Sequence, residues 1–249
     1  MQLKDATILI VDDEPDLRDI LANWFKREAH SVLVAANGAQ ALEAIEANHI
    51  DVIVSDVRMP VMDGIALLKN IKAGAHYRSS VMFISGFTDI EPRESYDLGV
   101  EAVMSKPVER KELLAVVTRV LAERDELWRL PPGSKSENAL EVVFDSLDAA
   151  LSQRLLAFGR GGFCILSARH LTEGPISLLL DFQADRRRVQ GHGVVRWTSL
   201  PEPEVGVEIT YIHDENRAWV LSLTGPNASL SFIPRTTAPV PMATMVIKV

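Results

Sequence analysis

Residues 51–64 read DVIVSDVRMPVMDG, and this stretch decides the fold of the first half of the chain. Its opening run, DVIVS, is β-branched and apolar without alternation, which predicts a parallel strand covered on both faces. In the loop that follows, a proline and a glycine end the strand and turn the backbone. Asp56 therefore stands at the C-terminal end of a buried strand, where open α/β sheets carry their chemistry.

Composition limits the class of protein. The 249 residues suffice for one large domain or two ordinary ones, and a hydrophobic content of 47% predicts well-packed cores. The single cysteine, Cys164, is typical of a reducing compartment. A net charge of −8 argues against broad affinity for nucleic acid, because phosphates are held mainly by Lys and Arg. We find no run suited to a membrane span or a signal peptide, and we expect a cytoplasmic protein.

Strands and helices alternate through the first half of the sequence. Strands are expected at 7–11, 31–36, 50–55, 80–85 and 102–105, and helices from Pro15 onward, at 40–48, at 65–71 and at about 91–98. This order predicts an α/β fold, a doubly wound five-stranded parallel sheet with right-handed crossovers. The ends of four strands then share one rim, which would hold Asp12, Asp13, Asp56, Ser85 and Lys106.

Three carboxylates follow the first strand, at Asp12, Asp13 and Glu14, directly before the proline that begins a helix. They repel one another unless a cation lies among them. A hard divalent cation with oxygen ligands, above all Mg²⁺, suits such a group. The alternative is an acidic helix N-terminus that complements the macrodipole. Taken alone, the three residues do not decide between these interpretations.

With these positions together, residues 3–127 resemble a two-component receiver domain of flavodoxin-like fold. The resemblance implies that Asp56 accepts a phosphoryl group from the phosphohistidine of a histidine kinase or a phosphotransfer protein. It also implies that Asp13 and Asp56 bind Mg²⁺ with the backbone carbonyl of Arg58, while Asp12 acts largely through bound water. Self-phosphorylation and self-dephosphorylation would be the only turnover, so we do not otherwise expect an enzyme.

Two more residues complete the implied pocket. Lys106 would neutralise the phosphoryl oxygens, and Ser85 would hydrogen-bond the new group and draw its loop toward it. Val103 departs from the family, because receivers usually carry an aromatic switch residue three positions before the lysine. The isopropyl group of Val103 cannot make the inward swing of a large aromatic ring. The sequence therefore does not show how phosphorylation would be signalled to the surface of the domain. Phe87 is a nearby aromatic, more simply interpreted as a packed loop residue.

The last receiver helix is expected at 109–128. Its apolar face comprises Leu113, Val117, Val120, Leu121 and Leu127. A helix of about twenty residues outruns the sheet that it covers, and its overhang is either a connector or a short dimerising coil. From the apolar face we expect a homodimer through this helix or its neighbouring face, strengthened by phosphorylation. The sequence PPGS at 131–134 then breaks the helix. We divide the chain into a receiver domain at 1–128, a linker at 129–138, a second domain at 139–223 and a tail at 224–249.

The second domain has short strands with hairpin signals. They are expected at 141–144, 163–166, 176–182, 189–198 and 205–212, with a short helix or irregular arm at 147–155 and a closing helix near 215–223. This pattern predicts a mostly antiparallel β-barrel. The segments GRGGFCI, ISLLLDF, GHGVVRW and VGVEITYI resemble a PilZ domain, a family that typically binds cyclic di-GMP.

The nucleotide-binding residues of that family are missing here. Its D/N-x-S-x-x-G turn reads AFGRGG, with Ala157 and Gly159 at the two side-chain positions. For the RxxxR segment of the linker, Arg124 and Arg129 lie one residue too far apart. Residues 186–188, RRR, could grip phosphates bidentately, but they fall in a predicted turn where charges are ordinarily solvated. We expect a degenerate PilZ-like domain that binds cyclic di-GMP weakly or not at all.

Three functions are compatible with this organisation. We favour a bacterial response regulator that signals through protein contacts of its PilZ-like domain to a downstream protein. The alternative is a dual sensor that also binds cyclic di-GMP through a non-standard site. A transcription factor would need a helix-turn-helix with a basic recognition helix, which the barrel pattern does not offer. The kinase, the target and the process controlled are not given by the sequence.

Overall fold

The computed structural model describes residues 1–74, 79–86, 89–129, 131, 138–166, 171–199, 203–224 and 231–236. Two compact units make up the chain, Met1–Glu123 and Arg124–Val249. The division falls five residues before the boundary that we expected for the receiver domain. Across the described ranges, every helix is too short or too polar to cross a membrane.

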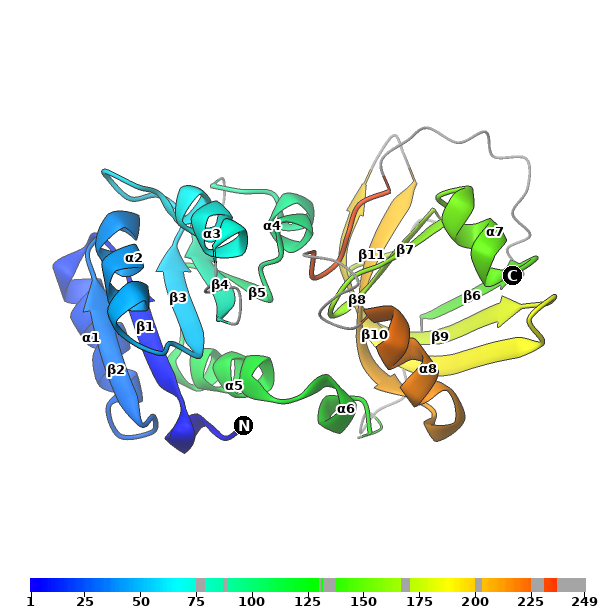
Figure 1. Ribbon diagram of the computed structural model, residues 1–249, viewed down its shortest axis with the longest axis horizontal. Coiled ribbons are helices and arrows are strands. Elements are labelled where there is room, and N and C mark those ends of the chain that lie inside the picture. Colours follow the sequence, from blue (N-terminus) through cyan, green and yellow to red (C-terminus); the bar gives the residue numbers. More distant parts are fainter. Residues whose placement is uncertain are drawn as a thin grey trace. The chain divides into compact units, whose positions relative to one another are not determined.

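The first unit is built on five parallel strands in the order β2-β1-β3-β4-β5 (Figure 1). The strands are β1 (Thr7–Val11), β2 (Ser31–Ala35), β3 (Val52–Asp56), β4 (Ser80–Ser85) and β5 (Ala102–Ser105). This is the doubly wound sheet that the sequence predicts, and it fits the flavodoxin-like order. The order reverses between β1 and β3, so the rim beside Asp56 lies at the switch point of the sheet.

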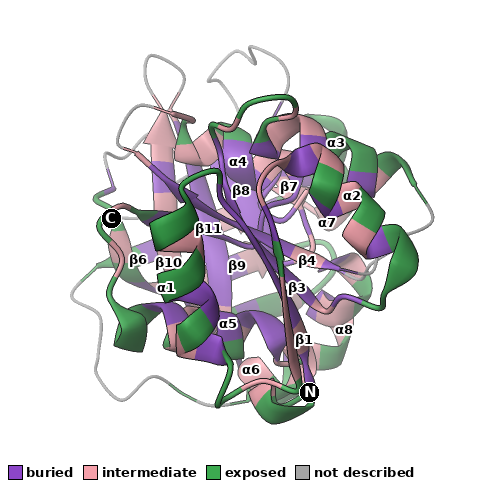
Figure 2. Cartoon of the chain, turned by 90° about the vertical axis from the view of Figure 1, so that its left-hand side faces the viewer, coloured by how far each residue is buried: buried purple, intermediate pink, exposed green. Residues whose placement is uncertain are grey.

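Helices cover both faces of this sheet. They are α1 (Pro15–Phe25), α2 (Gly38–Ala47), α3 (Gly64–Ala73), α4 (Pro92–Leu98) and α5 (Arg110–Leu121), after a short 3-10 turn at Leu3–Asp5. Buried residues of α1 and α5 share one apolar cluster with Ile8 and Ile10, whereas those of α2 and α3 share another with Leu9 and Val11. Successive residues of β1 thus enter opposite cores, which explains why the strands read as continuous apolar runs (Figure 2).

The prediction of a single helix at 109–128 is wrong. Helix α5 ends at Leu121, Ala122 is extended, and a separate short helix, α6, runs over Arg124–Leu127. The apolar stripe serves two cores: its members through Leu121 are buried in the first unit, and Leu127 packs with Trp128 in the second. The indole N–H of Trp128 donates to the carbonyl of Ile209 at 2.9 Å. The stripe that motivated a homodimer is therefore used within the chain.

The second unit is a six-stranded sheet in the order β6-β9-β10-β11-β8-β7. Its strands are β6 (Ala139–Phe144), β7 (Leu156–Phe158), β8 (Gly162–Leu166), β9 (Gly174–Phe182), β10 (Arg187–Ser199) and β11 (Glu204–Ile212), with helices α7 (Leu147–Ser152) and α8 (Asp214–Thr224). The pairs are antiparallel except β6 with β9. A mostly antiparallel sheet is confirmed, and its curl is consistent with a barrel (Figure 1).

Candidate functional site

Asp56 is the last residue of β3, between β1 and β4, and it is only 7% exposed. The following loop returns closely over it, because the N–H of Gly64 donates to the carbonyl of Val57 at 2.9 Å. A Cβ at Gly64 would lie 2.3 Å from the carbonyl oxygen of Asp56. Glycine is therefore required at this close approach, and the loop holds the carboxylate at the rim of the sheet.

Two further carboxylates from the end of β1 join Asp56. Oxygens of Asp12, Asp13 and Asp56 all lie within 4.8 Å of one another. Asp12 is buried, and it is fixed by the N–H of Glu14, which donates to Oδ1 at 2.9 Å, whereas Asp13 is exposed. Such a group of oxygen donors fits Mg²⁺, a hard cation that uses a few carboxylates and keeps several waters. The sequence prediction that these residues converge agrees with this geometry.

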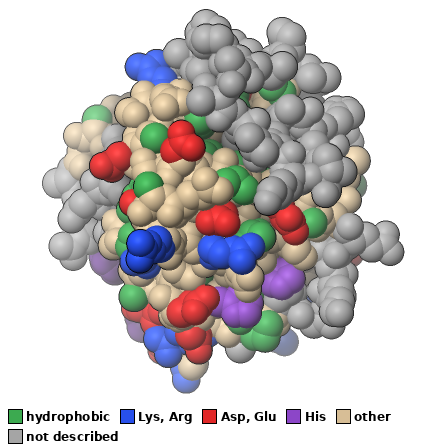
Figure 3. Space-filling model, turned by 90° about the vertical axis from the view of Figure 1, so that its right-hand side faces the viewer, with side chains coloured by type: hydrophobic (Ala, Val, Ile, Leu, Met, Phe, Trp, Pro, Cys, Tyr) green, Lys and Arg blue, Asp and Glu red, His purple; other side chains and the backbone are tan. Residues whose placement is uncertain are grey.

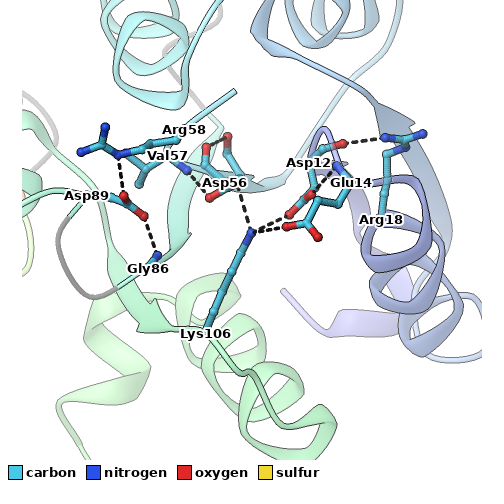
Figure 4. Close-up of polar contacts among 10 residues, drawn as sticks. Asp12, Glu14, Arg18, Asp56, Val57, Arg58, Gly86, Asp89 and Lys106 are labelled. Atoms are coloured by element: carbon cyan, nitrogen blue, oxygen red, sulfur yellow. Dashed lines mark hydrogen bonds and ion pairs between the residues drawn. The ribbon is translucent and has the colours of Figure 1, made fainter. Parts of the chain in front are cut away.

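Lys106 follows β5 and points into the same cluster (Figure 4). Its Nζ lies 3.0 Å from Oδ2 of Asp56, 3.2 Å from Oδ2 of Asp12 and 3.7 Å from Oε1 of Glu14. One ammonium thus faces three carboxylates, with Asp13 as a fourth nearby. The rim carries an excess of negative charge that suits a divalent cation.

Burial dominates the acid–base state of Asp56. It raises the pKa of this carboxyl, because a desolvated carboxylate loses hydration, and the charge of Asp12 acts in the same direction. The hydrogen bond and charge of Lys106 oppose the rise. For Lys106 itself, burial lowers the pKa, but the hydrogen bond that it donates to Asp56 and the charge of Asp12 outweigh burial, so the pKa is raised. Lys106 therefore remains an ammonium beside a destabilised carboxylate.

Ser85 is the last residue of β4 and is 4% exposed. It stands one position beyond Ile84, the register partner of Asp56, and its carbonyl accepts the N–H of Lys106 at 2.9 Å. Ser85 therefore lies at the rim where the sequence predicts it. Val103 lies in β5 opposite Phe83 and is half-buried, while Phe87 lies outside the described residues.

Three contacts at this rim could not be predicted from the sequence. The guanidinium of Arg18 donates to the carbonyl of Asp12 at 2.6 Å, which ties α1 to the end of β1. Asp89 accepts hydrogen bonds from Arg58 and from the N–H of Gly86 (Figure 4). Arg18 and Asp89 belong to no motif, because their partners are set by loop geometry rather than by spacing in the chain.

Three of the arginines considered for phosphate binding in the second unit, Arg187, Arg188 and Arg129, have internal partners. The guanidinium of Arg187 stacks 4.6 Å from the ring centre of Trp219, and Nε of Arg188 lies 3.4 Å from Asp181. Arg129 pairs with Asp125 one helical turn away. On the face drawn in Figure 3, basic, acidic and histidine side chains are interspersed rather than gathered into one basic patch.

The glycine turn of the second unit contacts the segment 231–236. The N–H groups of Arg160 and Gly161 donate to the carbonyls of Ser231 and Phe232, both at 2.9 Å. A Cβ at Gly161 would lie 2.0 Å from the ring of Phe232, so this glycine makes room for the ring. The turn is therefore covered by the protein's own chain.

Known proteins are similar to this chain over its first half. The response regulator receiver domain matches residues 8–118. The chain is 35% identical over 120 residues to sporulation initiation phosphotransferase F of Bacillus subtilis (strain 168), which covers 48% of this chain and 96% of that protein. It is 33% identical over 125 residues to the DNA-binding transcriptional regulator NtrC of Escherichia coli (strain K12), covering 50% of this chain but 26% of that regulator.

Among solved structures, the chemotaxis response regulator CheY4 of Vibrio cholerae is 30% identical, with a TM-score of 0.44, over 47% of this chain and 99% of that one. The matches to NtrC and to the regulatory protein AtoC of Escherichia coli (strain K12) span about a quarter of those proteins.

Proposed function

The chain belongs to the response regulator receiver family through its first unit, and from this premise we propose that it is a response regulator switched by phosphorylation of Asp56. One observation supports the choice of residue above all. Asp56 is a buried carboxylate with an ammonium at 3.0 Å and two further carboxylates within 4.8 Å. Phosphoryl transfer needs positioning and charge neutralisation more than covalent chemistry, and this rim offers both.

In the proposed reaction, a carboxylate oxygen of Asp56 attacks the phosphorus of a phosphohistidine on a histidine kinase or phosphotransfer protein. The P–O bond of an acyl phosphate forms, the P–N bond breaks, and the histidine nitrogen keeps the electron pair and takes a proton. Lys106, held on Oδ2 of Asp56, neutralises the phosphoryl oxygens. Bound Mg²⁺ would neutralise further charge, and Asp12, Asp13, Asp56 and the carbonyl of Arg58 would hold it.

The second unit is proposed as a PilZ-like output module that signals through protein contacts. Its mostly antiparallel sheet supports this assignment, as do arginines with internal partners and a glycine turn covered by residues 231–236. We place the protein in the cytoplasm, where a kinase would deliver the phosphoryl group. Apart from turnover of its own acyl phosphate, we propose no enzymatic activity.

Labelling with acetyl phosphate tests the central claim. With Mg²⁺, the full chain should be phosphorylated, and Asp56→Asn should abolish labelling because the amide cannot form the acyl phosphate. Asp19→Asn, which removes an exposed carboxylate from α1, should be labelled like the wild type. Beryllofluoride should bind only when Mg²⁺ is present. Undiminished labelling of the Asp56→Asn protein would refute the proposal.

A further inference from the structure

The carboxylate of Asp89 joins two loops at the rim of the receiver sheet (Figure 4). Its Oδ2 accepts the N–H of Gly86 at 2.6 Å, and its Oδ1 accepts Nε of Arg58 at 2.5 Å. The Asp89 side chain is 15% exposed, whereas that of Arg58 is 68% exposed. Asp89 is thus largely enclosed and has a donor on each carboxylate oxygen.

The two donors belong to the loops that must respond to phosphorylation. Gly86 directly follows Ser85, and Arg58 lies two residues beyond Asp56. For Ser85 to bond a phosphoryl group on Asp56, the chain at Gly86 has to approach Asp56. Asp89 holds this part of the chain from the other side. Its carboxylate is packed closely there, since a Cβ at Gly86 would lie 2.8 Å from Oδ2.

We infer that Asp89 is a positioning residue that competes with the phosphoryl group of Asp56 for the N–H of Gly86 and the guanidinium of Arg58. This inference rests on the proposed function and specifies how its resting state is held. A phosphoryl group brings close to two negative charges and three strong acceptor oxygens to the rim. Each donor can turn to it only by leaving Asp89, and the charge of Asp89 also repels it. Asp89 therefore stabilises the unphosphorylated conformation.

The two contacts contribute unequally. The ion pair of Arg58 with Asp89 is exposed on the Arg58 side and screened by water, so it contributes little free energy to the resting conformation. The short bond from the Gly86 N–H to a mostly enclosed carboxylate is charge-assisted and is the stronger of the two. Removing the whole carboxylate should therefore favour the activated state more than removing its charge alone, because asparagine keeps an acceptor for Gly86.

Beryllofluoride affinity of the full chain in Mg²⁺ tests this competition. Asp89→Ala should tighten binding about tenfold, the equivalent of one charge-assisted hydrogen bond, and Asp89→Asn about threefold. The matched control is Glu91→Gln, which removes an exposed carboxylate two residues further on, at the start of α4, with no side-chain capping bond. Its affinity should equal that of the wild type.

Hydrogen exchange of the Gly86 amide gives a second readout. It should be slow in the free wild type, fast in free Asp89→Ala, and slow in both with beryllofluoride. A wild type that fails to bind beryllofluoride in Mg²⁺ would defeat the proposed function itself. A wild type that binds, with no tightening in Asp89→Ala or with equal tightening in Glu91→Gln, would overturn this inference alone. If Asp89→Ala proves poorly folded, the affinity of Asp89→Asn replaces it in this test. No tightening in Asp89→Asn would then overturn the inference.

Discussion

In the first unit, Asp12 and Asp56 share the ammonium of Lys106, whereas in the second unit the carboxylate of Glu208 lies against the guanidinium of Arg196. Burial does not separate the two cases, because Asp56 is 7% exposed and Glu208 is 3% exposed. The two cases differ in charge balance. At the rim several carboxylates share the single ammonium of Lys106, whereas Nε and Nη2 of Arg196 lie 2.6 and 2.5 Å from one oxygen of Glu208.

This difference distinguishes a carboxylate that maintains a fold from one for which we propose a chemical role. A buried charge without its own counter-ion costs folding free energy, and it persists where a ligand or a covalent partner will neutralise it. A buried charge with a fixed partner needs nothing further.

Breaking the pair in the second unit should have the largest effect on stability. Arg196→Ala leaves the Glu208 carboxylate buried without its guanidinium, which should lower the free energy of unfolding by about 3–5 kcal/mol. Urea denaturation of the full chain, followed by tryptophan fluorescence, measures this because Trp128 and Trp197 lie in the core of that unit.

The control lies on the same strand. Arg188 of β10 also pairs with an acid of a neighbouring strand, Asp181, but its side chain is 61% exposed. Arg188→Ala should cost less than about 1 kcal/mol, as exposed pairs do. Equal losses in the two variants would show that burial of Glu208 does not matter, and the contrast between the units would fail.

Ligand binding to the second unit is the next largest effect. Cyclic di-GMP should bind with a dissociation constant beyond about 1 mM, roughly a thousandfold weaker than a micromolar site. Ala157 and Gly159 supply no side-chain hydrogen bonds, and residues 231–236 already use the N–H groups of the glycine turn. Calorimetric titration of the full chain tests this expectation.

A low-micromolar constant would favour the dual sensor instead. Residues 186–188 would then be the first to substitute, since Arg186 has a positive φ of 49° at the β9–β10 turn and Arg187 could leave Trp219 for a phosphate. The protein-contact proposal for this unit would have to be abandoned.

The sequence predicted the first unit well because its signals are local. An unbroken apolar run before Asp56 and turn residues after it fix a strand end, and parallel strands bring their ends to one rim. Strands β1, β4 and β5 have the predicted bounds. The convergence of Asp12, Asp13, Asp56 and Lys106 follows from that topology alone.

Most of the features that the sequence did not predict depend on contacts between residues far apart in the chain. The expected helix through residue 128 failed because hydrophobic periodicity does not say which core an apolar residue enters, and Trp128 belongs to the second unit. The strand β7 has three residues, too few for a period. Parallel pairing of β6 with β9 and the bonds of Asp89 depend on long-range or loop geometry, which spacing in the chain does not encode.

The smallest expected effect is on the stability of an Asp56 variant. Its sign should be opposite to that of the Arg196 variant, because removing the charge at the rim should stabilise the protein. Asp56→Asn should stabilise the free protein at neutral pH, because the folded state disfavours the buried carboxylate. Burial raises the pKa of the Asp56 carboxyl above its ordinary value of 3.8, so the folded state prefers the protonated form. The contribution of this carboxyl to the free energy of unfolding is therefore fully present below pH 3.8 and is lost as pH rises through the raised pKa.

Asparagine does not titrate, so its advantage over the wild type should be absent in acid, grow across that interval and then level off. Scanning calorimetry in EDTA, from acid to neutral pH, measures the difference, and Asp19→Asn should show none because its carboxylate is exposed. A variant that is less stable than the wild type at neutral pH would mean that Lys106 more than compensates the burial of Asp56. The rim would then resemble the Arg196–Glu208 pair, and its excess of negative charge could not explain the cation binding and phosphorylation that we propose.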